Sequence, residues 1–255
     1  EDPEHALAVL RAAAEAGATT LVLCDTNGGT LPTELKAVVA RTVREFPGVE
    51  IGIHTHNDAG CGVANALAAV EAGATHVQGT INGVGERCGN CDLVTTIANL
   101  QLKMGLKVVE EEQLRRLTEV SNYVSEIMNI TPDAHRPYVG RSAFAHKGGL
   151  HVDGISRDPR TYEHVAPELV GNQRRTPVGE LSGKNSVRAK AAELGLEVED
   201  VSTVLSAIKR KEHEGYHYEA ADASLALLIQ RTTGEDEPLF ELESLRVISE
   251  KRAGG

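Results

Sequence analysis

One pattern occurs three times in the first hundred residues: a short apolar run, a polar turn and then an amphipathic helix. The apolar runs, where we predict strands, are residues 20–24, 49–53 and 75–80. The helices that flank them are predicted at 3–16, 32–46, 63–72 and about 92–103. Strands and helices that alternate in this way indicate βαβ units and a parallel sheet.

Each predicted strand is followed directly by polar and glycine-rich residues. Cys24, His54 and Thr80 mark the strand ends, about one βα unit apart. Both α/β barrels and doubly wound sheets place their chemistry at this end of the strands. Three strands cannot close a barrel, so a barrel would need five strands before Glu1. The missing initiator Met also favours a fragment over a processed N-terminus.

The pattern changes after about residue 105. We predict one long helix at 110–128, and then a stretch at 131–183 that is rich in Gly, Pro and Arg with little periodicity. Further helices are predicted at 186–194, 199–212 and 220–231. Residues 240–248 alternate apolar and polar side chains, as a half-buried strand does.

The overall composition excludes several classes of function. The 255 residues carry a formal net charge of −11, which argues against nucleic acid as a partner because phosphate binding needs a basic face. No apolar run approaches the roughly 18 residues that span a bilayer. The acidic start does not resemble a signal peptide. The four cysteines lack the spacing of a secreted scaffold, so we expect a cytoplasmic protein that does not bind membranes.

The strongest local signal is the pair His54 and His56 at the end of the second predicted strand. Side chains alternate between the faces of a strand, so both imidazoles point the same way and can bind one ion. The alternative is a pair of surface or capping histidines. The loop that ends at Asn90 follows the next strand, and adjacent parallel strands bring such loops together. This favours a metal site to which Asn90 adds an oxygen.

Two imidazoles with oxygen ligands suit a divalent ion such as Mg²⁺, Mn²⁺ or Zn²⁺. Such an ion acts as a Lewis acid toward a substrate with two neighbouring oxygens. A 2-oxoacid fits, because its carboxylate and ketone oxygens chelate together. Asp25 and Thr26, after the preceding strand, can contact such a substrate. The alternative is a plain turn, since Asp-Thr-Asn-Gly-Gly favours turns by itself.

Two further features are less specific. Cys88 and Cys91 form a single CxxC pair, but structural zinc needs four ligands. We interpret them as small residues of a tight loop rather than as a redox pair. His146 and His151 flank a Lys-Gly-Gly sequence, where the glycines would let a histidine approach a ligand. Their spacing alone does not distinguish this from an ordinary loop.

Four motifs occur in order: Leu-Cys-Asp-Thr-Asn-Gly-Gly-Thr-Leu-Pro from residue 23, His-Thr-His-Asn-Asp from 54, Gly-Thr-Ile-Asn-Gly-Val-Gly-Glu-Arg-Cys-Gly-Asn from 79, and Phe-Ala-His-Lys-Gly-Gly-Leu-His-Val from 144. Together they resemble the family of 2-isopropylmalate, homocitrate and citramalate synthases, the Claisen-condensing branch of the TIM-barrel metallolyases. The Asn-Gly-Gly-Thr-Leu-Pro turn, the Glu-Arg-Cys-Gly-Asn loop and the Asp-Pro-Arg-Thr-Tyr-Glu-His sequence at 158–164 are most similar to the citramalate branch.

The resemblance implies a fold and a division into domains. The fold class is α/β: about three βα units from the C-terminal part of a TIM (β/α)8 barrel, followed by mostly helical subdomains. Residues 1–105 would belong to the catalytic barrel, and 106–183 to a post-barrel helix and linker. Residues 184–236 would form a helical subdomain. Residues 237–255 would begin a regulatory domain that is cut short.

The resemblance also implies roles at the strand ends. His54 and His56 would be metal ligands, and Asn90 would be a third ligand or a close neighbour of the ion. Thr26, next to Asp25, would contact the carboxylate of the 2-oxoacid. The loop that presents Asn90 would be shaped by Glu86, Arg87 and Gly89.

Two residues outside the barrel are implied as well. His151 would be the base, or part of a relay, that removes a proton from the methyl group of acetyl-CoA. Tyr162 would help to position that group. In this family the segment that carries His151 reaches into the barrel of the neighbouring subunit, so a homodimer with shared active sites is expected.

The implied reaction condenses acetyl-CoA with pyruvate to give (R)-citramalate and CoA, a step in isoleucine biosynthesis. One alternative is a 2-isopropylmalate synthase, which uses 2-oxoisovalerate in leucine biosynthesis. Another is an aldolase-type lyase, disfavoured by the long section after the barrel. A third is a non-catalytic dimerisation or sensing module. The Arg-Asp pair of the family's first strand and an early catalytic Glu are absent here, so this chain alone should be inactive. A feedback amino acid would bind the missing regulatory domain.

Overall fold

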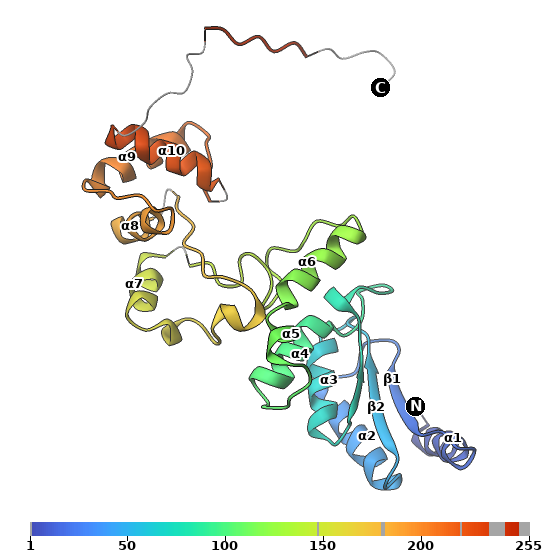
Figure 1. Ribbon diagram of the computed structural model, residues 1–255. Helices are drawn as coiled ribbons and strands as arrows, with labels where there is room; N and C mark the ends of the chain where they lie inside the picture. Colours follow the sequence, from blue (N-terminus) through green and yellow to red (C-terminus); the bar gives the residue numbers. More distant parts are fainter. Residues whose placement is uncertain (1, 147, 180–181, 220, 235–242, 250–255) are drawn as a thin grey trace. The chain divides into compact units, whose positions relative to one another are not determined.

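The computed structural model describes residues 2–146, 148–179, 182–219, 221–234 and 243–249 (Figure 1). The chain divides into two compact units. Unit 1 consists of Glu1–Ala145 and Pro159–Arg175, and unit 2 consists of His146–Asp158 and Thr176–Gly255. The segment Pro159–Arg175 therefore returns to the unit that contains the sheet. The four predicted domain boundaries stay predictions.

Unit 1 is built on a three-stranded parallel sheet. Its strands, in their spatial order, are β1 (Thr20–Asp25), β2 (Glu50–Thr55) and β3 (His76–Gln78). The helices that alternate with them are α1 (Pro3–Glu15), α2 (Pro32–Glu45), α3 (Gly62–Glu71) and α4 (Leu93–Leu102). Every strand and helix predicted for this region is present, with small differences at the ends.

The starts of these helices follow from the sequence. Asp2 caps α1, because its carboxylate accepts a hydrogen bond from the backbone N–H of His5 at 3.0 Å. Asp92 caps α4 in the same way through Val94, at 3.1 Å. Pro32 occupies the first turn of α2, where the missing N–H of proline costs no hydrogen bond. Local capping therefore sets where each βα unit turns from loop to helix.

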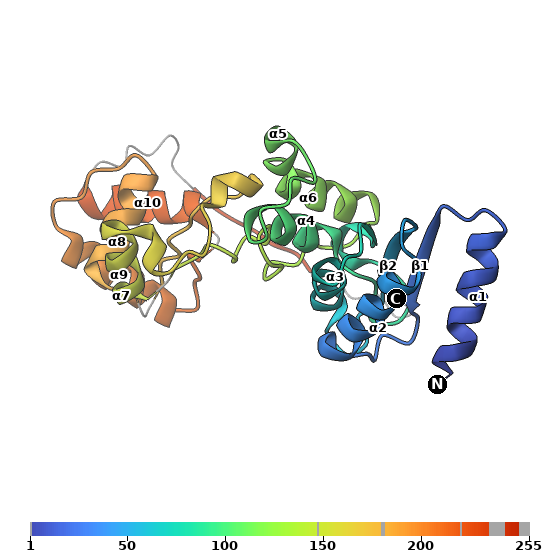
Figure 2. The same cartoon turned by 90° about the horizontal axis from the view of Figure 1, so that it is seen from below.

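The two faces of the sheet differ in character. Leu21 and Ile53 point toward the helices and are buried in an apolar cluster with side chains of α2. Figure 2 shows α2 and α3 beside β1 and β2, with α1 on the outer side of β1. Cys24 and His54 belong to the opposite face, since strand side chains alternate, and they are exposed and half-buried respectively. Cys24 and His54, at the ends of β1 and β2, thus lie on the face without helices.

The segment after α4 departs from one expectation. A single helix was predicted at 110–128, but the structure has α5 (Glu111–Leu114) and α6 (Leu117–Ile127). The break falls where the backbone of Arg115 passes close to Gly171, in the segment that returns to unit 1. The prediction was wrong because hydrophobic periodicity carries no information about such a long-range contact.

The stretch 131–183 contains more structure than its composition indicates. A helix, α7 (Gly149–Arg157), lies in it, together with the 3₁₀ turns η2 (Pro159–Thr161) and η3 (Pro167–Val170). Helix α7 starts with glycine, a poor helix former, but buries Val152 and Ile155 on one side. Tertiary packing rather than propensity therefore makes this helix, which is why the sequence did not predict it.

Unit 2 is helical. Besides α7 it contains the three predicted helices, found as α8 (Lys184–Glu193), α9 (Val201–His213) and α10 (Asp222–Thr233). Its apolar core includes the fully buried residues Val187, Val204, Ile208, Leu225 and Ile229. Buried Lys190 is satisfied by two carboxylates, Glu193 at 2.8 Å and Asp222 at 3.0 Å. Helices α8, α9 and α10 are therefore joined by apolar packing, and the charge of Lys190 also joins α8 to α10.

The predicted strand near the C-terminus falls partly outside the described residues. Residues 243–249 are described and pair with no described strand, and Leu245, Val247 and Ile248 are 77%, 82% and 75% exposed. A strand without a partner leaves its backbone groups unpaired. The assignment of this segment to a further domain stays a prediction. In the part of the chain that the structure describes, no helix combines the length and apolar character needed to cross a membrane.

Candidate functional site

The ends of the three strands lie in register. Cys24 pairs with His54 across β1 and β2, and His54 pairs with Gln78 across β2 and β3. Residues in register on neighbouring strands project from the same face of a sheet. Cys24, His54 and Gln78 therefore form a row across the strand ends, on the face turned away from α2 and α3.

His54 and His56 are neighbours in space. Their ring centroids are 5.3 Å apart, and the ring planes are inclined by 55°. His56 follows β2 directly and forms an isolated backbone bridge with Asn90 from the loop after β3. The alternation argument from the sequence and the observed ring geometry agree that both imidazoles face the same side.

Backbone hydrogen bonds join the loop after β3 to the end of β2 and to the loop that follows β2. The N–H of Asn57 donates to the carbonyl of Gly89 at 2.9 Å, and the N–H of Cys91 donates to Thr55 at 2.8 Å. Gly89 has a φ of +88°, and a Cβ added there would collide with the carbonyl oxygen of Gly83. The loop therefore needs glycine at this position to bring Asn90 next to His56.

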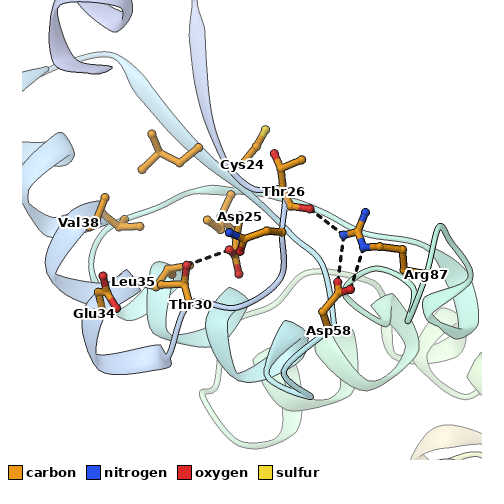
Figure 3. A pocket seen from close by; sticks show the side chains of 13 residues that line it. Cys24, Asp25, Thr26, Thr30, Glu34, Leu35, Val38, Asp58 and Arg87 are labelled. Carbon is orange, nitrogen blue, oxygen red and sulfur yellow. Dashed lines mark hydrogen bonds and ion pairs between the residues drawn. The ribbon is translucent and has the colours of Figure 1, made fainter. Parts of the chain in front are cut away.

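Arg87 connects the loops after all three strands (Figure 3). Its guanidinium donates to both carboxylate oxygens of Asp58, at 2.8 and 3.0 Å, and to the backbone carbonyl of Thr26 at 2.8 Å. One of its nitrogens also lies 3.2 Å from Nδ1 of His56. The hydrogen bond from Arg87 lowers the pKa of Asp58 below its ordinary value. The sequence singled out Arg87 for shaping the loop, but it did not identify these partners.

Asp25 and Thr26 are separated by the alternation of the strand. The Asp25 carboxylate is buried on the helix side, where it accepts hydrogen bonds from the Thr30 hydroxyl at 2.9 Å and the Asn65 amide at 3.4 Å (Figure 3). The carboxylate therefore lies on the face of the sheet opposite the histidine pair, and Asp25 also lines the cavity beside β1. The role of Asp25 in contacting a substrate stays a prediction. Thr26 is exposed.

A cavity of about 860 Å³ lies beside β1 (Figure 3). A cavity of this volume can hold a small-molecule ligand. Its polar lining includes Thr26, Asp58 and Arg87, but neither His54 nor His56. The cavity therefore borders the histidine pair through Arg87 and does not contain it.

Glu86, Cys88 and Cys91 are further residues of the loop after β3, called the β3 loop below, and they have few side-chain contacts. Glu86 is 81% exposed in its side chain and lies 3.8 Å from Arg87. Cys88 is exposed, whereas Cys91 is buried with its sulfur 3.0 Å from the Thr96 hydroxyl. Burial raises the pKa of the Cys91 thiol. Both cysteines are free thiols, so the CxxC pair forms no disulfide.

His151 and Tyr162 belong to different units. His151 lies on α7 in unit 2, where it is exposed and its ring is 6.5 Å from that of His146. Tyr162 follows η2 in unit 1 and is 41% exposed. The next residue, Glu163, is buried in a bidentate ion pair with Arg174, with both contacts at 2.6 Å. The roles of His151 and Tyr162 stay predictions.

The donor atoms at the strand ends fit part of a metal shell. Two imidazoles lie side by side, and Asn90, which carries an amide oxygen, follows in the adjoining loop. Among the described residues, no three His, Cys, Asp or Glu side chains gather in a group that could hold an ion. The available ligands are therefore two imidazoles and one amide. This set suits a divalent ion that has further oxygen ligands.

The roles of two residues of this site, Gln78 and Asp58, were not predicted from the sequence. Gln78 contacts His54, with 3.2 Å between the amide oxygen and Nδ1. Asp58 anchors Arg87. Strand alternation places Gln78 on the same face as His76, but only the pairing register brings it against His54. No signal in the sequence pairs Asp58 with Arg87 across the two loops.

Comparison with known proteins agrees with this architecture. Residues 1–124 match the HMGL-like family, and residues 138–215 match a family described as homocitrate synthase post-HMGL domain-like. The predicted fold class, βα units of a TIM-type barrel followed by mostly helical sections, is confirmed by the first match, the parallel sheet and the helices of unit 2. The chain is thus an α/β protein of the barrel type.

Individual relatives narrow the assignment. The chain is 50% identical to the (R)-citramalate synthase of Synechocystis sp. over 96% of this chain and 47% of that protein. It is 51% identical to the (R)-citramalate synthase of Streptomyces coelicolor over 100% of this chain and 48% of that protein. A homocitrate synthase of Sulfurisphaera tokodaii is 35% identical over 91% of this chain and 50% of that protein. Residues 1–124 thus belong to the HMGL-like family, and the chain along almost its whole length is similar to citramalate and homocitrate synthases. It spans about half the length of the curated relatives it matches.

Proposed function

We propose that this chain supplies part of the active site of a citramalate synthase, an acyltransferase that condenses acetyl-CoA with pyruvate to give (R)-citramalate and CoA. The observation that carries the proposal is the identity of 50% and 51% to two (R)-citramalate synthases over nearly the whole chain. The homocitrate synthase, which the matched region resembles less, reaches 35%. The histidine pair at the strand ends supports a metal-assisted reaction there, because its two imidazoles lie close enough to bind one ion.

A divalent metal ion belongs to this proposal, since the family is metal-dependent. His54, His56 and Asn90 would hold the ion, which we propose to be Mg²⁺, Mn²⁺ or Zn²⁺. When bound, it would supply Lewis acidity toward the ketone of the 2-oxoacid. The positions of these three residues support the assignment because they come from two adjoining strand ends that backbone hydrogen bonds hold together.

The residues around the ion site would bind and orient the 2-oxoacid. Thr26 is exposed at the end of β1, lines the cavity there and carries a hydroxyl that can donate to a carboxylate. Arg87 holds the loop of Thr26 to the loop of His56. Gly89 and Glu86 complete the loop that presents Asn90.

Removal of a proton from the methyl group of acetyl-CoA requires a positioned base, because that proton is very weakly acidic. We assign this role to His151, acting alone or in a relay, with Tyr162 as a positioning group. Helix α7 buries Val152 and Ile155 and exposes His151 together with Leu150, which is 75% exposed. Such an outward-facing histidine is suited to act in a neighbouring subunit, so we also propose a homodimer with shared sites.

The test is a chimera in which this chain replaces the matching half of the Synechocystis (R)-citramalate synthase. We expect release of CoA from acetyl-CoA with pyruvate, and much slower release with 2-oxoisovalerate. His54→Ala should abolish the release while the circular dichroism of the chimera stays unchanged. A folded chimera that prefers 2-oxoisovalerate, or that keeps its activity after His54→Ala, would contradict the proposal.

The shared site has its own test. The chimera with His54→Ala and the chimera with His151→Ala should each be inactive. Mixed dimers of the two should regain part of the activity, because one of their two sites then combines an intact His54 with an intact His151. Failure to regain any activity in mixed dimers, shown to have formed by mass spectrometry, would place both residues in one subunit.

A further inference from the structure

In both histidines of the proposed metal site, Nδ1 contacts a neighbouring side chain. The partner of His54 is a hydrogen-bond acceptor, and the partner of His56 is a hydrogen-bond donor. Nδ1 of His54 lies 3.2 Å from the amide oxygen of Gln78. Nδ1 of His56 lies 3.2 Å from a guanidinium nitrogen of Arg87. An amide oxygen only accepts hydrogen bonds, and a guanidinium only donates them. In the neutral rings, Nδ1 of His54 must therefore carry the proton, and Nδ1 of His56 must carry the lone pair.

The side-chain amide of Gln78 contacts a histidine at each of its two ends. Its amide nitrogen lies 3.3 Å from Nε2 of His76, so the side chain bridges His54 and His76. His76 in turn lies against Gly52, where an added Cβ would come within 2.9 Å of its ring. The amide oxygen thus faces His54 and the amide nitrogen faces His76.

Arg87 holds His56 more weakly than it holds its other partners. One guanidinium nitrogen, Nη2, has two hydrogens but three acceptors: the Thr26 carbonyl at 2.8 Å, Asp58 at 3.0 Å and His56 at 3.2 Å. The contact with His56 is the longest of the three. It can be given up while Arg87 keeps the loops after the three strands together.

We propose that Gln78 and Arg87 are positioning residues that prepare the two histidines differently for a divalent ion. Gln78 holds His54 as the Nδ1–H tautomer, which leaves Nε2 free to bind the ion at once. Arg87 holds His56 as the Nε2–H tautomer. Whichever nitrogen of His56 binds the ion, the contact with Arg87 must break, because Nδ1 either becomes the ligand or takes up the proton. The inference rests on the metal site proposed above.

The test reads the tautomers directly in the metal-free chain. Two-bond ¹⁵N–¹H correlation spectra are recorded with ¹⁵N-labelled histidine, at a pH well above the ordinary histidine pKa of about 6.5. We expect His54 as Nδ1–H and His56 as Nε2–H. Gln78→Leu should change the pattern of His54 and leave that of His56 unchanged, whereas Arg87→Met should change the pattern of His56 and leave that of His54 unchanged. Gln78→Glu keeps an acceptor oxygen and should preserve the tautomer of His54.

A titration with Zn²⁺, a diamagnetic probe, separates this inference from the metal site itself. Gln78→Leu should weaken Zn²⁺ binding by about 10-fold, the usual effect of losing a partner behind a metal-binding histidine. Identical tautomers for both rings, or an unchanged His54 in Gln78→Leu, would overturn the inference even if Zn²⁺ binds. The expected tautomers without any Zn²⁺ binding, both in this chain and in the chimera that supplies the other half of the protein, would support the roles of Gln78 and Arg87 and overturn the proposed metal site. If Arg87→Met does not fold, the Gln78 variants alone decide.

Discussion

The strand-end loops of unit 1 and the helical core of unit 2 are ordered by different forces. The loops are joined by backbone hydrogen bonds, such as that from Asn57 to Gly89, and by the guanidinium of Arg87. The core of unit 2 is joined by apolar side chains such as Ile208 and Leu225, which are almost fully buried. In the strand-end loops the direction of each contact matters, because each hydrogen bond has a defined donor and acceptor. In the core of unit 2 the volume of each side chain matters.

This difference teaches where each region is sensitive. Apolar burial is roughly proportional to area, so the helical core should respond gradually to the size of a side chain. A directional network should instead fail at single positions where no substitute fits, as at Gly89 or Arg87. Changes in the loops should therefore affect the site more than the stability, and changes in the core should do the reverse.

The largest expected effect lies in the core of unit 2. Ile208→Ala should lower the free energy of unfolding by about 2–5 kcal/mol, because it removes buried apolar volume and leaves a cavity. Ile208→Val should cost about 0.5–1.5 kcal/mol. Urea unfolding followed by circular dichroism measures both. Leu227→Ala on α10, at 44% exposure, is the matched control and should stay within about 0.5 kcal/mol. Equal losses for Ile208→Ala and Leu227→Ala would contradict the buried core.

The next effect tests the glycine of the β3 loop. Gly89→Ala adds a Cβ against the carbonyl of Gly83 and keeps a φ of +88°, so it should cost about 1–3 kcal/mol and remove Zn²⁺ binding. Gly195→Ala is the control, since its φ is +73° but no atom lies within 4 Å of the added Cβ. It should cost less and leave Zn²⁺ binding unchanged. Loss of Zn²⁺ binding in both variants would mean that the loop has no special role.

The distinction between apolar packing and directional hydrogen bonds also explains how far the sequence predicts each region. The βα pattern and the helices of unit 2 were predictable, since hydrophobic periodicity reports which face is buried. The histidine pair was predictable as well, because strand alternation alone puts His54 and His56 on one side. Helix α7 was not, since it begins with glycines and exists through packing.

The sequence predicted those features of the site that depend on a single strand, but not the contacts between strands and loops. Asp25 was predicted to contact a substrate, but its hydrogen-bond partners Thr30 and Asn65 were not predicted, because they come from the loop after β1 and from α3. The role of Gln78 depends on the register between β2 and β3, which no single strand specifies. The pair formed by Asp58 and Arg87 joins two loops across the chain. Contacts between elements are thus the part that sequence patterns leave out.

The pH dependence of Asp58 measures how firmly Arg87 joins the loops. The hydrogen bond from Arg87 lowers the pKa of this carboxyl from its ordinary value of 3.8. The stabilisation from the pair is therefore present above pH 3.8 and is lost as the pH falls through the lowered pKa. Carboxyl ¹³C spectra should show Asp58 titrating below 3.8, and back near 3.8 in Arg87→Met. Unchanged titration in that variant would show that Arg87 does not hold Asp58 in solution.

The smallest expected effect concerns the two cysteines of the β3 loop. Cys88 is exposed and should react readily with iodoacetamide, whereas Cys91 is buried against Thr96. Burial raises the pKa of Cys91 above its ordinary value of 9.0, so its thiolate, the reactive form, is disfavoured. Because the raised pKa belongs to an acid, the folded state should lose stability only as the pH rises above 9.0.

Mass spectrometry of the labelled peptide measures the order of reaction. Cys88→Ser should remove the fast reaction in this loop and leave Cys91 unlabelled until urea unfolds the chain. Gly89→Ala should expose Cys91, because the carbonyl of Gly89 bonds to the loop after β2 and the N–H of Cys91 bonds to Thr55 at the end of β2. If Cys91 reacts as fast as Cys88 in the unaltered chain, the two loops are not joined in solution. The hydrogen bonds between the strand-end loops would then not order these loops, and the contrast with the apolar core of unit 2 would not hold.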